Sequence, residues 1–146
     1  MNTIRQLLRE KGQDIWSVPP DATVYEALQL MAEKDIGAVL VMDGEKLVGI
    51  FSERDYARKV ILHDRSSRET RVREIMTPEV VCVSPEQSID ECMGLMTTRR
   101  IRHLPVVEEG GRVTGVISIG DVVKAVISDQ AQLISHLHAY ILGERA

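Results

Sequence analysis

The chain has 146 residues, of which 44% are hydrophobic but only 3% aromatic, and its formal net charge is −4. That length and apolar content suffice for a packed core of aliphatic side chains. The mixed, slightly acidic charge provides no basic surface for nucleic acid, and no apolar run reaches the roughly 18 residues that span a bilayer. We therefore expect a cytoplasmic protein that binds neither nucleic acid nor membrane.

The first half of the chain predicts, in order, a strand near Trp16, a helix, two strands and another helix. Apolar residues mark one face of the first helix at the spacing i, i+3, i+4 and i+7: Val24, Ala27, Leu28 and Met31. Two strand-like runs follow within residues 37–51, and residues 55–63 predict the second helix. The unit therefore reads strand, helix, strand, strand, helix.

The second half repeats this pattern after a polar linker, residues 64–71. The alignment places Val83 on Val18 and Gly115 on Gly49, with one residue inserted in the turn between the two strands. Cys92 falls on the position of Ala27, which predicts a small core residue rather than a reactive thiol. Duplication of one structural unit is the simplest account of this pattern.

An α+β fold follows, with two tandem β-α-β-β-α units packed as a pseudo-twofold pair. We place the first unit at residues 1–66, the second at 67–130 and a C-terminal helical extension at 131–146. The tail carries an apolar helical stripe: Val123, Val126, Ile127, Leu133, Ile134, Leu137 and Ile141. Part of this stripe lacks a partner within one chain, which favours a homodimer. The amphipathic N-terminal segment 3–12 is expected to pack beside this tail.

The phrase GIFSERD at residues 49–55 returns as GVISIGD at 115–121. In each, a serine and an aspartate stand where a strand gives way to a helix: Ser52 and Asp55, then Ser118 and Asp121. The hydroxyl can donate to a phosphate, and the carboxylate can accept from a ribose diol. S-x-x-D is equally a helix-capping signal that needs no ligand.

The duplicated phrases, the RHLPVV strand at residues 102–107 and the VREIMTPEV segment at 72–80 resemble the CBS domain, which occurs in tandem pairs. The resemblance covers about residues 2–130. It implies binding of an adenosine-containing ligand, such as AMP, ADP, ATP, NAD or S-adenosylmethionine, in the cleft between the units. The matching aspartates would hold the ribose and the matching serines would lie near the phosphates. The resemblance also implies a homodimer.

In this family each site is completed by residues from the other unit. Arg102 and His103 would thus reach the phosphates held by Ser52 and Asp55, beside Arg54. The equivalent positions in the first unit, Gly37 and Ala38, carry no charge. With Arg58 and Lys59 on the following helix, we expect the first site to be richer in cations and to prefer more phosphate or bind more tightly. The alternative for these arginines is a solvated helix face, which applies to Arg54, Arg58, Arg99 and Arg100 and less to Arg102.

Three further positions match the family's base-binding surface. Trp16 would cover the adenine, with Val81 as its counterpart in the second unit, or Trp16 packs against the core. Thr77 contacts the base or only begins a turn before Pro78.

The chain contains no recognisable nucleophile elbow, phosphate loop or metal-binding motif, so we expect no enzyme, catalytic cofactor or metal. The prediction is a regulatory module that senses an adenine nucleotide and acts on a protein whose identity the sequence does not reveal. The alternative is a ligand-independent interaction module with degenerate pockets. A weak nucleotide hydrolase ranks third.

Overall fold

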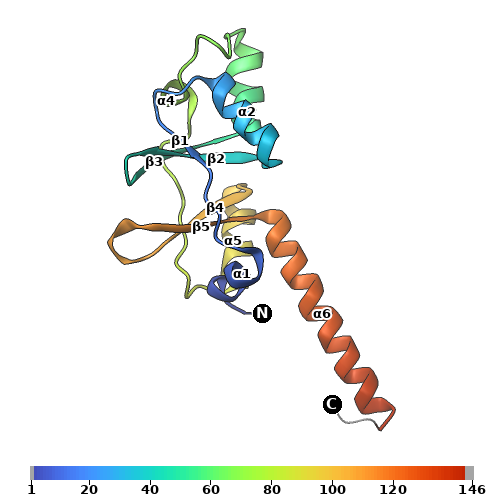
Figure 1. The fold of residues 1–146 in the computed structure, drawn as a ribbon. Coiled ribbons are helices and arrows are strands. Elements are labelled where there is room, and N and C mark those ends of the chain that lie inside the picture. Colours follow the sequence, from blue (N-terminus) through green and yellow to red (C-terminus); the bar gives the residue numbers. More distant parts are fainter. Residues whose placement is uncertain (1, 144–146) are drawn as a thin grey trace.

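The computed structural model describes residues 2–143, so Met1 and residues 144–146, the last three of the predicted extension, lie outside it. Two similar units lie one above the other in Figure 1, and a long C-terminal helix points away from them. The predicted α+β architecture with its long final helix is therefore confirmed.

The first unit contains a three-stranded sheet with the order β1-β2-β3. β1 (Ser17–Val18) pairs in parallel with β2 (Ala38–Asp43), which pairs antiparallel with β3 (Lys46–Ser52). α2 (Val24–Lys34) begins at the N-cap Thr23, whose hydroxyl accepts from a backbone N–H of the first turn. The predicted helix after β3 is irregular, because α3 (Glu53–Asp55) continues as a π-helix over Tyr56–Val60 and a 3-10 helix over Ile61–His63.

The second unit contains α5 (Ile89–Arg99), the antiparallel hairpin of β4 (His103–Val107) and β5 (Val113–Ser118), and α6 (Ile119–Ile141). Its predicted first strand does not form. Only Val83 bridges to β4, where it exchanges hydrogen bonds with Pro105 and Val107. In the first unit Ser17 adds a second pairing to that of Val18, whereas its counterpart Cys82 makes none.

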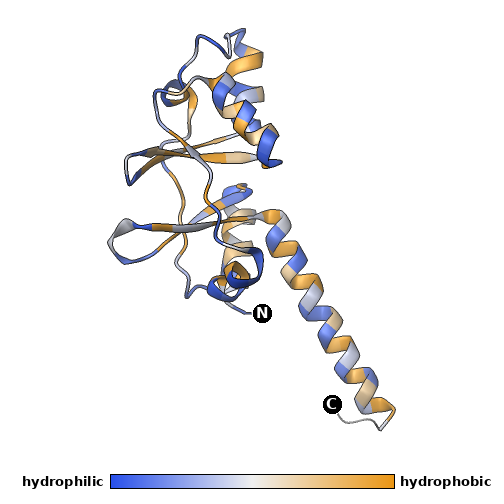
Figure 2. Cartoon of the chain, in the orientation of Figure 1, coloured by the Kyte–Doolittle hydropathy of each residue, from blue (hydrophilic) through white to orange (hydrophobic). Residues whose placement is uncertain are grey.

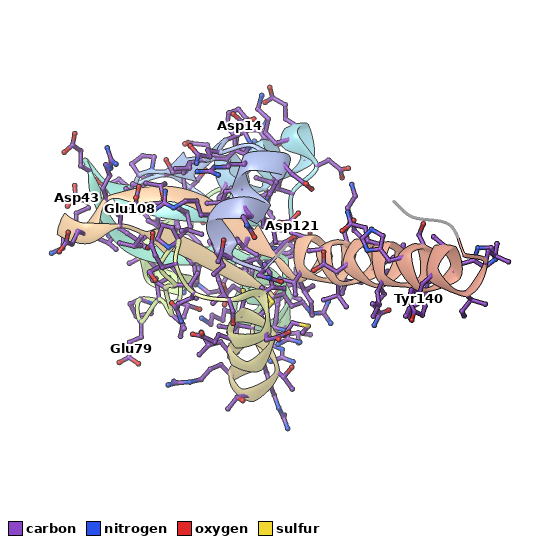
Figure 3. All side chains as sticks on the ribbon, turned by 90° about the horizontal axis from the view of Figure 1, so that it is seen from below. Asp14, Asp43, Glu79, Glu108, Asp121 and Tyr140 are labelled. Atoms are coloured by element: carbon purple, nitrogen blue, oxygen red, sulfur yellow. The ribbon has the colours of Figure 1, made fainter. Side chains whose placement is uncertain are left out.

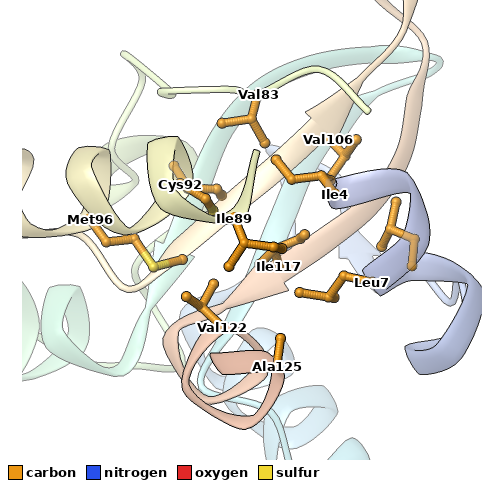
Figure 4. Close-up of a cluster of buried hydrophobic side chains, with 12 residues drawn as sticks. Ile4, Leu7, Val83, Ile89, Cys92, Met96, Val106, Ile117, Val122 and Ala125 are labelled. Carbon is orange, nitrogen blue, oxygen red and sulfur yellow. The ribbon is translucent and has the colours of Figure 1, made fainter. Parts of the chain in front are cut away.

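The units exchange short helices. α1 (Ile4–Lys11) buries Ile4, Leu7 and Leu8 in the core of the second unit, as Figure 4 shows for Ile4 and Leu7. In return α4 (Val72–Ile75) buries its two terminal apolar residues in the core of the first unit. Each core is thus completed by a segment that precedes the other sequence repeat.

The core of the second unit includes Cys92, which is fully buried as expected for a small core residue. α1 shares this core with Val122 and Ala125 in the first turns of α6, so the predicted packing of the N-terminal segment beside the last helix is confirmed at the start of that helix. α6 itself passes the predicted boundary at residue 130 without a break.

Most of the apolar stripe on α6 is exposed to solvent, and Figure 2 shows hydrophobic and hydrophilic residues alternating along this helix. The exposed members are Val123, Ile127, Leu133, Ile134, Leu137 and Ile141. Among residues 2–143, no helix combines the length and the apolar character that crossing a membrane requires.

Candidate functional site

Two cavities lie where the units face each other. The first, of about 390 Å³, is lined from both units. It brings together six of the predicted site residues: Ser52, Arg54, Asp55, Thr77, Arg102 and His103. The second cavity, of about 450 Å³, contains Trp16, Ser118 and Asp121, and His103 also lines it. Val81 lines neither cavity and packs instead at the edge of the second core.

Ser52 and Asp55 form the predicted capping box at the end of β3. The Ser52 hydroxyl accepts from the Asp55 backbone N–H at 3.2 Å, and one carboxylate oxygen of Asp55 accepts from the Ser52 N–H at 3.0 Å. Ser118 and Asp121 form the same box at the start of α6. Both Ser–Asp pairs therefore cap their helices in the folded chain. Any role in ligand binding must be compatible with these capping hydrogen bonds.

The carboxylate of Asp55 is fully engaged. Besides its bond from the Ser52 N–H, the Oδ2 atom accepts the Ser52 hydroxyl at 3.1 Å. The Oδ1 atom accepts the Thr77 hydroxyl at 3.2 Å and lies 3.0 Å from the Lys59 ammonium. Thr77 therefore has a specific role at the first cavity: it binds Asp55, and its backbone pairs with that of Ile50. A ribose hydroxyl can reach Asp55 only by replacing one of these donors.

Three arginines line the first cavity: Arg54 from α3, and Arg100 and Arg102 from the second unit. The guanidinium of Arg54 donates to the Arg100 carbonyl at 3.2 Å, across the boundary between the units. Arg100 adopts the left-handed conformation that ends α5. Arg54 and Arg100 are both exposed to solvent, as the helix-face alternative expects, and both also line the cavity, to which the turn after α5 brings Arg100.

Trp16 lines the second cavity and belongs to neither core, so its core alternative is wrong. Its side chain is 37% exposed, and the Lys34 ammonium lies 4.4 Å from the ring centroid. Trp16 precedes β1 of the first unit but shares its cavity with Ser118 and Asp121 of the second. The second cavity, like the first, is therefore assembled from both units.

Lys11 at the end of α1 is a site residue that the sequence pattern did not indicate. Its ammonium donates to Asp121 Oδ2 and to the Val116 carbonyl, both at 2.6 Å. Figure 3 shows Asp121 at the start of α6, beside α1. Burial raises the pKa of Asp121, but the hydrogen bonds from Lys11 and Ser118 and the charge of Lys11 outweigh it, so the pKa lies below its ordinary value.

Gly37, Ile50 and His103 line both cavities and so form the wall between them. A Cβ on Gly37 would lie 3.4 Å from His103 Nε2, so the absence of a side chain lets the units approach here. Burial lowers the pKa of His103, and the charges of Lys11 and Arg102 lower it further against the opposing effect of Asp121.

The two cavities differ in charge. Three arginines face two carboxylates, Glu53 and Asp55, in the first cavity. In the second cavity, Lys11 faces three carboxylates, those of Asp14, Asp35 and Asp121. The first cavity therefore suits an anionic group such as phosphate, and the second disfavours one.

The sequence model of the CBS domain matches residues 4–62 and 72–128. The chain belongs to the CBS-domain family. The two matches correspond to the two sequence repeats, so the protein contains a tandem CBS pair. The predicted resemblance is confirmed.

Relatives of this CBS pair agree with the assignment. The mitochondrial CBS domain-containing protein CBSX3 of Arabidopsis thaliana is 42% identical over 151 residues, which cover 97% of this chain and 72% of that protein. A solved CBS-domain protein from Burkholderia ambifaria MC40-6 is 56% identical, with a TM-score of 0.84 and coverage of 88% of this chain and 96% of that one.

A more distant CBS-domain protein, from Pyrobaculum aerophilum, was solved in complex with AMP. It is 24% identical, with a TM-score of 0.73, and the match covers 82% of this CBS pair and 88% of that chain. At this identity the likeness shows that the two proteins share the fold.

Proposed function

We propose that the first cavity binds an adenine nucleotide, AMP, ADP, ATP or a relative such as NAD, and that binding regulates a partner protein. The observation that carries this proposal is the meeting of Arg100 and Arg102 with the Ser52–Asp55 cap of the other unit. Guanidinium groups are suited to phosphate because they donate hydrogen bonds in a planar fork. A CBS-domain protein of the same fold has been solved with AMP, in agreement with this ligand class.

Each residue has a role in this proposal. Arg54 and Arg102 neutralise the phosphates, and the Ser52 hydroxyl donates to a phosphate oxygen in place of Asp55 Oδ2, to which it donates in this structure. Ile50 and Ile101 supply apolar surface in the same cavity for the base. Asp55 accepts from the ribose after one of its present donors, Thr77 or Lys59, turns away.

Because the ligand would contact both units, its binding would favour one arrangement of the pair over another. That arrangement would be the signal read by a second protein. The exposed α6 stripe gives this module a surface for a second copy of the chain, and we retain the homodimer and the cytoplasmic location as predictions. The function is regulatory rather than catalytic in this proposal.

The test is calorimetric titration of ATP and AMP into the wild-type chain and two arginine variants. Arg102→Ala should weaken ATP binding by tenfold or more, since a charge-assisted hydrogen bond contributes about 1.5–3 kcal/mol. Arg99→Ala is the matched control, because Arg99 is exposed on α5 and does not line the cavity. Equal affinities of the wild type and Arg102→Ala would reject the site.

One observation favours a second candidate, the ligand-independent interaction module. Both S-x-x-D phrases already satisfy their capping hydrogen bonds without a ligand. In that case ATP and AMP would change neither the stability nor the assembly of the chain, and loss of the apolar α6 stripe would abolish its function.

A further inference from the structure

Five exposed arginines gather around the first cavity. Three of them, Arg54, Arg100 and Arg102, line that cavity. Arg58 lies four residues after Arg54 in the same helical segment, about one turn further along it. Arg99 is the last residue of α5 and directly precedes Arg100. We call these five residues the arginine surface.

The arginine surface is set apart by its lack of carboxylate partners. Among residues 2–143, none of its five members takes part in an ion pair, although the chain has 22 acidic residues against 18 lysines and arginines. Four arginines elsewhere do pair with carboxylates: Arg5 with Glu86 and Glu108, Arg65 with Glu74, Arg73 with Asp21, and Arg112 with Glu108. A cluster of uncompensated like charges attracts an anionic partner.

The two carboxylates of the first cavity do not compensate this charge. Asp55 is already opposed by Lys59, whose ammonium lies 3.0 Å from Oδ1. Of the two carboxylates that line the cavity, Glu53 alone therefore remains against the arginines. A guanidinium has five N–H donors, and the bond from Arg54 to the Arg100 carbonyl uses one of them. Most of the donor capacity of the arginine surface is thus available to a partner.

The backbone beneath the arginine surface is held in place by hydrogen bonds between elements. The Glu53 N–H donates to the Gly37 carbonyl at 3.0 Å, and the Ile119 N–H donates to the Arg102 carbonyl at 2.8 Å. A partner that binds here therefore orders arginine side chains but not loops, which limits the entropic cost of binding.

The surface favours an acidic polypeptide over a nucleic acid. Guanidinium forks match carboxylates as well as phosphates. A nucleic-acid strand also needs a continuous basic groove and aromatic faces for its bases. Glu53 interrupts the basic surface, and among the described residues no Phe, Tyr or Trp lines the first cavity. A short run of Asp and Glu residues satisfies the five arginines without either requirement.

We propose that the arginine surface docks an acidic segment of the regulated partner protein, and that a nucleotide in the first cavity competes with this segment. The two ligands share the three arginines that line the cavity, whereas Arg58 and Arg99 contact the segment alone. The competition rests on the proposed function, and the docking does not. The nucleotide releases the partner by occupying arginines that the acidic segment requires.

The experiment uses the full chain and a fluorescein-labelled peptide of about ten glutamates, with fluorescence anisotropy as the readout of binding at low salt. The double variant Arg58→Ala/Arg99→Ala should bind this peptide about three- to tenfold more weakly than the wild type, because each exposed ion pair contributes modestly. Calorimetry should show that the same variant binds ATP within about twofold of the wild type. Arg102→Ala should weaken the binding of both ligands.

The matched control is the double variant Arg9→Ala/Arg112→Ala. Both arginines are exposed and line neither cavity, so this variant loses the same charge at a distance from the arginine surface. It should bind the glutamate peptide within about twofold of the wild type. ATP should release the peptide from the wild type, and sodium sulfate at the same ionic strength should release less.

Three results would overturn the docking: equal peptide affinities of the wild type and the Arg58/Arg99 variant, an equal loss in the control variant, or tighter binding of a single-stranded oligonucleotide of the same length than of the peptide. A peptide that stays bound at saturating ATP would overturn the competition. If the peptide binds through Arg58 and Arg99 but ATP does not bind the wild type, the proposed function has failed and the docking stands.

Discussion

Gly115 and Leu8 provide the sharpest test of how α1 completes the second unit. A Cβ on Gly115 would lie 2.7 Å from Cδ2 of Leu8, which is itself only 2% exposed. Gly115→Ala must therefore displace the buried Leu8 side chain and should cost about 1–3 kcal/mol of unfolding free energy, as overpacking does. Leu8→Ala removes buried methyl groups and should cost about 3 kcal/mol. At roughly 2–4 °C per kcal/mol, Leu8→Ala should lower the melting midpoint by about 6–12 °C.

The double variant tests directly whether Leu8 and Gly115 are in contact. In the Leu8→Ala background, the space left by the leucine should accept the new methyl group, so Gly115→Ala should cost less than about 0.5 kcal/mol there. Urea unfolding of the four proteins gives a coupling free energy, which we expect to be at least about 0.5 kcal/mol. Additive costs would show that α1 does not pack on β5 in solution. The hydrogen bond from Lys11 at the end of α1 to Asp121 would then also be absent. Leu62→Ala, at a 76% exposed leucine, is the control and should change little.

Three further predictions concern charge, reactivity and assembly. The pKa of His103 lies below its ordinary value of 6.5, so the unfolded chain binds this proton more tightly than the folded chain does. The contribution of His103 to stability is therefore complete above pH 6.5 and is lost as the pH falls below it. Between pH 7.5 and 5.5, urea unfolding should show a smaller loss of unfolding free energy for His103→Gln than for the wild type. Burial raises the pKa of Cys92 to about 11, so a thiol reagent at pH 8 should label the exposed Cys82 first, and faster labelling of Cys92 would contradict the packed second core. If the α6 stripe joins two copies, Leu137→Glu should lower the sedimentation coefficient while Ser135→Glu does not, and a wild type that sediments as a monomer would refute the dimer.

Much of the fold was predictable because the two sequence repeats show the same order of helix and strand patterns. The apolar faces that begin at Val24 and Ile89 correctly predicted α2 and α5. The matching glycines, Gly49 and Gly115, aligned the two hairpins. The serine and aspartate of each phrase cap their helices as their spacing indicated. These features depend on contacts between residues close in sequence, which a local pattern can report.

The parts that were missed depend on distant contacts. Periodicity showed that α1 is amphipathic and placed it beside the last helix, but not that it completes the core of the second unit. Lys11 lies outside the aligned repeats, and no residue near it in sequence signals its bond to Asp121. The second unit keeps a single bridge at Val83 where the first unit has a strand, although both units carry a proline two residues later, so the aligned sequences do not show this difference. For Trp16, the pattern gave its position but could not decide between core and cavity.

The most direct measurement of the central claim is the thermal unfolding of the wild-type chain across a concentration series of ATP. A ligand that binds the native state at a hundred times its dissociation constant adds about 2.7 kcal/mol to stability. We therefore predict that the melting midpoint rises by roughly 5–11 °C, and that Arg102→Ala needs at least about tenfold more ATP for the same rise. A wild-type midpoint that stays constant up to millimolar ATP, AMP and NAD would contradict the account and favour the ligand-independent interaction module.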